Sequence, residues 1–159
     1  MSARLIIQNK IAINASAAKV WDALTNPEQT KKYMFGCETV CDWKPGSPLL
    51  WKGSYEGKEM VFVKGNIVEI DPGRFLSYTT IDPNSPIADI PENYLTVTYN
   101  LNEENLPSGQ AGGHTVFTVT QGDYSKVADG EKRYKDAYNN GEGWNPILVE
   151  IKKIVETEE

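Results

Sequence analysis

The C-terminal end of the chain carries the pattern that most restricts the fold. Apolar side chains recur there at three- and four-residue steps, and charged side chains occupy the remaining positions: Trp144, Ile147, Leu148, Ile151, Ile154 and Val155 against Glu150, Lys152, Lys153 and Glu156. This spacing predicts an amphipathic helix. Pro146 fits its first turn, where a missing N–H costs little. A helix with one apolar stripe needs an apolar surface to cover.

The residues before this helix predict that surface. Residues 5–15 alternate between apolar and polar side chains, as a half-buried strand does. From residue 37 to residue 121, strand-forming runs are separated by turn-forming residues that include Pro and Gly. The clearest strands are predicted at 49–55, 60–70, 75–81, 94–101 and 115–121, with a loop at 102–113. About seven strands joined by short connections indicate an antiparallel sheet.

Two short helices are predicted directly after the first strand. Ser16 can cap a helix that begins at Ala17, and Asn26 can cap a second one with Pro27 at its first position. A weaker helical pattern covers residues 129–140. This order of elements predicts an α+β helix-grip fold, in which a curved antiparallel sheet wraps around the long C-terminal helix. We expect a single domain over residues 1–159.

Charge and cysteine content limit the classes of function. The chain has 159 residues and a net charge of −6, which disfavours nucleic acid as a partner. It has no apolar stretch long enough to span a membrane. Cys37 and Cys41 would lie roughly 13 Å apart on one strand, too far for a disulfide. Free thiols suit a reducing compartment, so we expect a cytoplasmic protein. With His114 as the single histidine, we expect no metal site and no cofactor.

Three segments resemble a known superfamily. They are IAINASAAKVWDALT at 11–25, VEIDPGRFLSYT at 68–79, and the pair Gly143-Trp144 that leads into the last helix. Together they resemble START-like (SRPBCC) domains, most closely the branch named after the C-terminal domain of the activator of the heat-shock chaperone ATPase. The resemblance implies a helix-grip fold with a hydrophobic cavity. The chain departs from the usual pattern in a Pro-rich loop at 82–91 and in residues 126–143.

The aromatic residues are the best candidates for a binding site. A concave apolar gap between a sheet and a helix is a common place for a small molecule, and Trp and Tyr can offer it both a ring and a polar tip. Trp144 is the strongest candidate, followed by Trp51 and Tyr78, although simple core packing is the more common role of such residues. The predicted ligand-binding residues are Trp51, Tyr55, Phe62, Tyr78, Tyr99, Phe117, Trp144 and Leu148.

Three functions are compatible with this sequence. The first is binding of a small hydrophobic molecule, favoured because no catalytic set such as Ser-His-Asp and no Gly-rich phosphate loop stands out. The second is an enzyme of the cyclase, dehydratase or hydrolase type, which needs a cavity-facing carboxylate or tyrosine with a shifted pKa. The third is a regulatory domain that interacts with a chaperone. Both a monomer and a homodimer remain open, since an exposed strand edge can pair.

Overall fold

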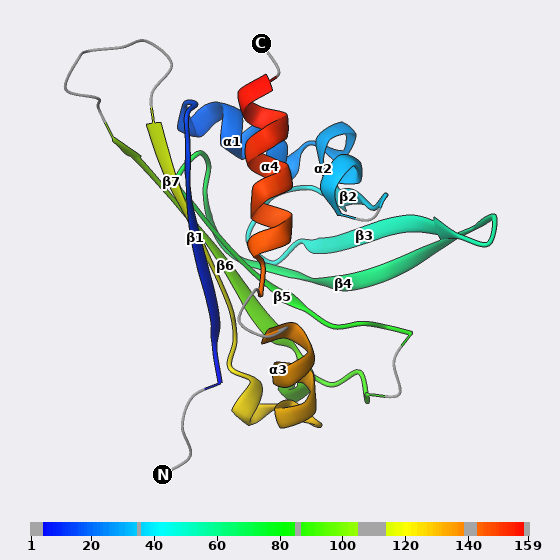
Figure 1. Ribbon diagram of the computed structural model, residues 1–159. Coiled ribbons are helices and arrows are strands. Elements are labelled where there is room, and N and C mark those ends of the chain that lie inside the picture. The colour runs from blue at the N-terminus through cyan, green and yellow to red at the C-terminus, as the bar shows by residue number, and fades with distance from the viewer. Residues whose placement is uncertain (1–4, 35, 85–86, 105–113, 139–142, 158–159) are drawn as a thin grey trace.

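One antiparallel sheet forms the frame of the molecule (Figure 1). The computed structural model describes residues 5–34, 36–84, 87–104, 114–138 and 143–157. Within them, seven strands lie in the order β1-β7-β6-β5-β4-β3-β2. The strands are β1 (Ile7–Ile13), β2 (Glu38–Cys41), β3 (Pro48–Tyr55), β4 (Lys58–Asp71), β5 (Phe75–Thr80), β6 (Leu95–Glu104) and β7 (His114–Gly122).

This topology confirms the predicted sheet. Strands β2 to β7 are neighbours in chain order, and β1 pairs antiparallel with β7, so the first and last strands of the chain lie side by side. The loop predicted at 102–113 begins later than expected, because β6 continues to Glu104, whereas β7 begins at His114, directly after the predicted end of the loop. Residues 105–113 lie outside the described residues.

The helices begin where the sequence predicts. The Ser16 hydroxyl accepts a hydrogen bond from the Lys19 N–H at 3.3 Å and caps α1 (Ala17–Thr25). The Asn26 side chain accepts one from the Glu28 N–H at 3.0 Å and caps α2 (Pro27–Tyr33). Two further helices, α3 (Gly130–Tyr138) and α4 (Asn145–Thr157), complete the described set, together with short 3-10 turns at Pro91–Asn93 and Tyr124–Lys126. None of the described helices is both long and apolar enough to cross a membrane.

Helix α4 lies across the concave face of the sheet, as Figure 1 shows, and the side chains of its apolar stripe belong to the core cluster beneath it. Leu148 and Ile151 are completely buried, and Val155 is 4% exposed. Trp144 and Ile147, at the start of the helix, are only half-buried. The predicted stripe is therefore confirmed, and the fold is a helix grip. The contact between helix and sheet is tight toward the C-terminus of α4 and looser at its beginning.

A buried threonine covers the edge of the sheet at β2. The Thr30 hydroxyl, on α2, donates to the Cys37 carbonyl at 3.1 Å and accepts from the Thr39 N–H at 3.3 Å. The Thr39 hydroxyl in turn donates to the carbonyl of Thr25 at 2.9 Å. These contacts satisfy backbone groups that an edge strand would otherwise present to another chain.

Helix α4 protects the opposite edge, at β1. Lys152 donates from Nζ to the Ala12 carbonyl at 3.1 Å, and the Asn14 N–H donates to Oε2 of Glu156 at 2.8 Å. Lys152 and Glu156 also pair with each other. Both edges are thus partly occupied by contacts within the chain, which disfavours a dimer built by pairing edge strands.

Replacing Thr30 with Val tests the edge contact at β2. Valine keeps the shape but leaves the Cys37 carbonyl and the Thr39 N–H without their partner, so the free energy of unfolding should fall by about 1–3 kcal/mol. Urea denaturation followed by circular dichroism measures this change. Thr30→Ser, which keeps the hydroxyl, is the matched control and should lose clearly less. Equal losses in both variants would show that the hydroxyl is not what stabilises this edge.

Candidate ligand cavity

A cavity of about 540 Å³ lies between the beginning of α4 and the concave face of the sheet. Such a volume falls within the range of roughly 300–1,000 Å³ that is usual for small-molecule sites. Strands β3 to β7 form its floor, and α2, α3 and α4 contribute side chains around it. The described residues that line it are Met34, Cys37, Trp51, Phe62, Val63, Tyr78, Thr80, Val97, Gln121, Ala137, Gly143, Trp144 and Ile147.

A β-bulge shapes the floor of the cavity at β3 and β4. Trp51 pairs with Val63, but the next residue, Lys52, pairs with Val61, so Phe62 is an extra residue on β4. Side chains normally alternate between faces along a strand, and a bulge breaks that alternation. This is why the consecutive residues Phe62 and Val63 both line the cavity. Gly53 makes room for the ring, since a Cβ at that position would lie 2.7 Å from Phe62.

Three polar contacts hold Trp144 over the sheet. Its backbone N–H donates to Oδ1 of Asn9 at 2.9 Å, and its indole Nε1–H donates to Oε1 of Gln121 at 2.7 Å. Its carbonyl accepts from the N–H of Leu148 at 2.9 Å. The preceding residue must be small: Gly143 has a φ of +49°, and a Cβ there would lie 2.5 Å from Oδ1 of Asn9. Glycine therefore allows the chain to enter α4 close against β1.

Tyr99 is the centre of an aromatic cluster behind the cavity wall. Its ring makes edge-on contacts with Tyr78, Phe117 and Trp144, with centroids 5.4, 5.3 and 6.0 Å apart. The Tyr78 and Tyr99 hydroxyls share a hydrogen bond of 2.6 Å. Edge-on aromatic pairs stabilise beyond their buried area. The cluster therefore fixes the positions of the two rings, Tyr78 and Trp144, that face the cavity.

The cavity contains few polar atoms, and none of its described lining residues is charged. Its polar lining side chains are Tyr78, Thr80 and Gln121, together with the Cys37 thiol. Burial raises the pKa of that thiol, and it raises the pKa of Tyr78 well above the ordinary 10.0. Both groups are thus protonated at neutral pH. The cavity can offer hydrogen bonds, but the described lining residues provide no carboxylate or histidine that could act as a general base.

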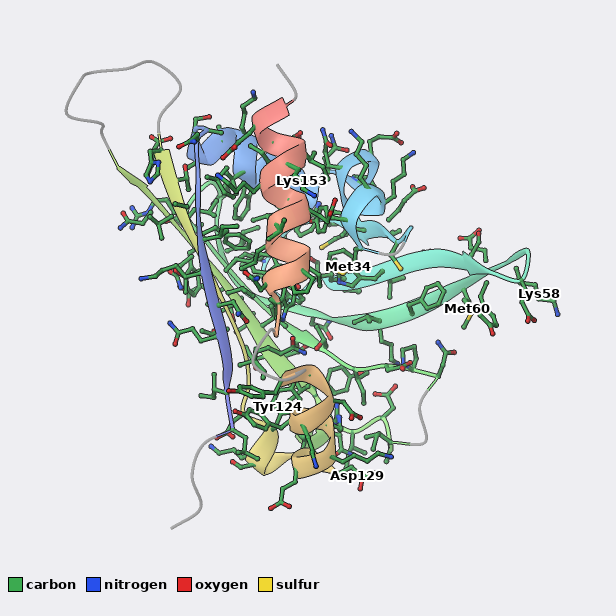
Figure 2. The ribbon with its side chains drawn as sticks, viewed as in Figure 1. Met34, Lys58, Met60, Tyr124, Asp129 and Lys153 are labelled. Carbon is green, nitrogen blue, oxygen red and sulfur yellow. The ribbon has the colours of Figure 1, made fainter. Side chains whose placement is uncertain are left out.

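The predicted site residues fall into three groups. Trp51, Phe62, Tyr78 and Trp144 lie together on the cavity wall. Tyr99, Phe117 and Leu148 are buried in the core behind that wall. Tyr55 is 60% exposed and pairs with Lys58 at the tip of the β3–β4 hairpin. Figure 2 shows how far this tip lies from Met34, at the base of the hairpin.

Sequence reasoning missed several residues that line the cavity. Thr80 and Gln121 continue the inward faces of predicted strands, so the alternation pattern could have identified them. Met34 ends α2, and Ala137 lies on α3. Only the tertiary structure brings these two residues to the cavity, because α2 and α3 are far apart in the sequence.

A second, larger hollow of about 1,220 Å³ has a different character. It lies between the start of α1 and the turn from β4 to β5. Its charged lining residues include Asp71, which pairs with Arg74 at 3.5 Å, and Glu103, which accepts the Ala17 N–H at 2.6 Å. Each of these two carboxylates therefore already has a partner within the chain. Among the described residues, no group of three His, Cys, Asp or Glu side chains is placed to hold a metal ion.

Comparison with known proteins identifies the family. Residues 14–156 match the family described as Activator of Hsp90 ATPase homolog 1-like protein. The chain therefore belongs to this family, in agreement with the START-like resemblance of its motifs. A search of curated proteins gives no match.

Solved structures show the same fold over nearly the whole chain. A protein of Cytophaga hutchinsonii is 38% identical, with a TM-score of 0.72 over 98% of this chain and 97% of that one. The Aha1 dimer of Colwellia psychrerythraea is 17% identical, with a TM-score of 0.63 over 96% of each chain. An HSP90 activator from Plasmodium falciparum is 14% identical, with a TM-score of 0.60 over 95% of this chain and 96% of that one.

The buried tyrosines predict a loss of stability at alkaline pH. Burial raises the pKa values of Tyr33, Tyr78 and Tyr99 above the 10.0 expected in the unfolded chain. The folded state therefore keeps protons that the unfolded state releases, and the stability present below pH 10 is lost as the pH rises further. Each phenol should remove on the order of 1 kcal/mol between pH 10 and 11. Urea denaturation at a series of pH values measures the slope.

One variant assigns a share of that slope. Tyr99→Phe should make it shallower by the contribution of one phenol. An identical slope in the wild type and Tyr99→Phe would mean that Tyr99 ionises normally and is not enclosed as described.

Proposed function

We propose that this member of the activator of Hsp90 ATPase homolog 1-like family binds a small, neutral, largely apolar molecule between α4 and the sheet. The observation that carries the proposal is the cavity itself: about 540 Å³, bounded mainly by apolar and aromatic side chains, with no charge among its described lining residues. Removing apolar surface from water drives binding to such a site. A charged ligand would lose its hydration without gaining a partner.

The chemistry of the wall favours binding over catalysis. An enzyme of the cyclase, dehydratase or hydrolase type needs a group that can take up or release a proton near neutral pH. Tyr78 and Cys37 face the cavity, but burial raises the pKa of each. Thr80 and Gln121 do not titrate. These side chains are suited to orienting a ligand by hydrogen bonds.

The family suggests a second candidate function, interaction with the Hsp90 chaperone. Its support is the family match over residues 14–156 and the likeness to a solved HSP90 activator. That likeness covers the fold of nearly the whole chain but rests on 14% identity. Stimulation of the Hsp90 ATPase by this protein, retained when the cavity is filled, would favour this function over ligand binding. For either function we place the protein in the cytoplasm, a compartment that suits its free cysteines, Cys37 and Cys41.

Filling the cavity tests the binding proposal. We expect the neutral dye N-phenyl-1-naphthylamine to show saturable fluorescence enhancement with the wild-type protein. Ala137→Trp places a large ring in the cavity and should weaken dye binding at least about tenfold, because the ring occupies the space that the dye needs. Lys135→Trp, at an exposed position on the same helix, is the matched control and should bind as the wild type does.

A second variant that fills the cavity keeps the test decisive if Ala137→Trp does not fold. Val63→Trp fills the cavity from the opposite side, and urea denaturation shows which variants fold. Binding that does not saturate in the wild type, or that both folded filling variants retain, would contradict the proposal.

A further inference from the structure

The oxygen-bearing and amide side chains of the cavity lie on one side of it. Tyr78 on β5 pairs with Val97 on β6, which pairs with Gln121 on β7, so these residues form one row across three strands. Thr80 lies two residues beyond Tyr78 and therefore shares its face. The side chains that α2, β3 and β4 contribute are mainly apolar: Met34, Trp51, Phe62 and Val63. The polar groups on that side are the Trp51 indole N–H and the Cys37 thiol. A ligand would thus meet hydrogen-bonding groups over β5 to β7 and apolar surface over β3 and β4.

The contact with Trp144 fixes the orientation of the Gln121 amide. An indole N–H can only donate, so the atom that accepts it at 2.7 Å must be the amide oxygen, Oε1. The amide nitrogen, Nε2, then points away from the indole. Among the described residues, Nε2 has no hydrogen-bond acceptor, and no buried side-chain nitrogen or oxygen is left without a partner. Nε2 is therefore accessible, on a residue that lines the cavity.

Thr80 provides a second unused polar atom. The residue is only 9% exposed, yet within the described part of the chain its hydroxyl has no hydrogen-bond partner. Because no buried side-chain oxygen in that part lacks a partner, this hydroxyl must reach open space, and Thr80 lines the cavity. A threonine hydroxyl can both donate and accept, whereas the Gln121 Nε2 can only donate.

From this arrangement we infer that the ligand carries an uncharged hydrogen-bond-accepting oxygen, such as a carbonyl, at the end that lies over β5 to β7. Gln121 Nε2 donates to this oxygen, and Thr80 lies beside the same polar end. The apolar body of the ligand packs against Trp51 and Phe62. This inference rests on the proposed binding function and adds the chemical class and orientation of the ligand.

Three naphthalenes of nearly the same shape test the inference. 2-Acetylnaphthalene has the carbonyl, 2-isopropylnaphthalene replaces its oxygen with a methyl group, and 2-naphthoate replaces the acetyl group with a charged carboxylate. Dissociation constants come from displacement of N-phenyl-1-naphthylamine. We expect the wild-type protein to prefer the ketone over the hydrocarbon about three- to tenfold, the usual effect of one hydrogen bond. Binding of 2-naphthoate should be at least about tenfold weaker than that of the ketone.

Variants assign this preference to the two polar residues. Gln121→Met removes the donor, and Gln121→Glu removes it while keeping an oxygen for the Trp144 indole, so both should abolish the preference for the ketone. Thr80→Val should reduce it. Thr96→Val, at an exposed position on β6, is the matched control and should keep the wild-type ratio. Because the readout is a ratio of two affinities, a general loosening of the cavity does not imitate the expected result.

The outcomes separate this inference from the proposed function. Equal binding of ketone and hydrocarbon, or a ratio unchanged in folded Gln121→Met and Gln121→Glu, would overturn the inference and leave hydrophobic binding intact. Tightest binding of 2-naphthoate would overturn the neutral character of the ligand. Failure of N-phenyl-1-naphthylamine and of all three naphthalenes to bind would overturn the proposed function itself.

Discussion

The packing of α4 on the concave face of the sheet is the interaction on which the rest of the molecule depends. Leu148, Ile151 and Val155 leave water almost completely there, and a fully buried aliphatic side chain of this size contributes roughly 1.5–3 kcal/mol. The same helix covers the edge of β1 through Lys152 and Glu156. Its first turn is less tightly packed, and the cavity lies against that turn. One helix therefore closes the core at one end and bounds the cavity at the other.

The cavity persists because its walls are held by their own contacts. Trp144 is fixed by hydrogen bonds to Asn9 and Gln121, and its ring rests on Tyr99. On the opposite side, the bulge at Phe62 turns two consecutive side chains of β4 inward. In the proposed binding function, walls fixed in this way keep the space open for a ligand. In that proposal, the polar groups over β5 to β7 give a bound molecule a preferred orientation.

The sequence predicted the elements of this fold better than the details of its site. Helical periodicity and capping residues were sufficient to predict α1, α2 and α4. Ser16 and Asn26 cap their own helices, and the apolar stripe ending at Val155 lies within a single helix, so these signals are local in the sequence. Alternation was sufficient for most strands. It missed Val63, since the bulge at Phe62 depends on the partner strand and leaves no mark in the local pattern. It also placed Tyr55 among the binding residues, although the hairpin carries that side chain into solvent. Met34 and Ala137 come from separate helices, so only the assembled fold brings them to the cavity.

The most direct measurement of the central claim is a two-dimensional ¹H–¹⁵N spectrum of the indole groups during titration with N-phenyl-1-naphthylamine. The chain has four tryptophans. Trp51 and Trp144 line the cavity, whereas Trp21 and Trp43 pack against the core elsewhere. If the dye binds in the cavity, the indole signals of Trp51 and Trp144 shift together and saturate at one dye concentration, while those of Trp21 and Trp43 remain in place. Shifts confined to Trp21 and Trp43, or to backbone signals around the turn at Asp71 and Arg74, would contradict it.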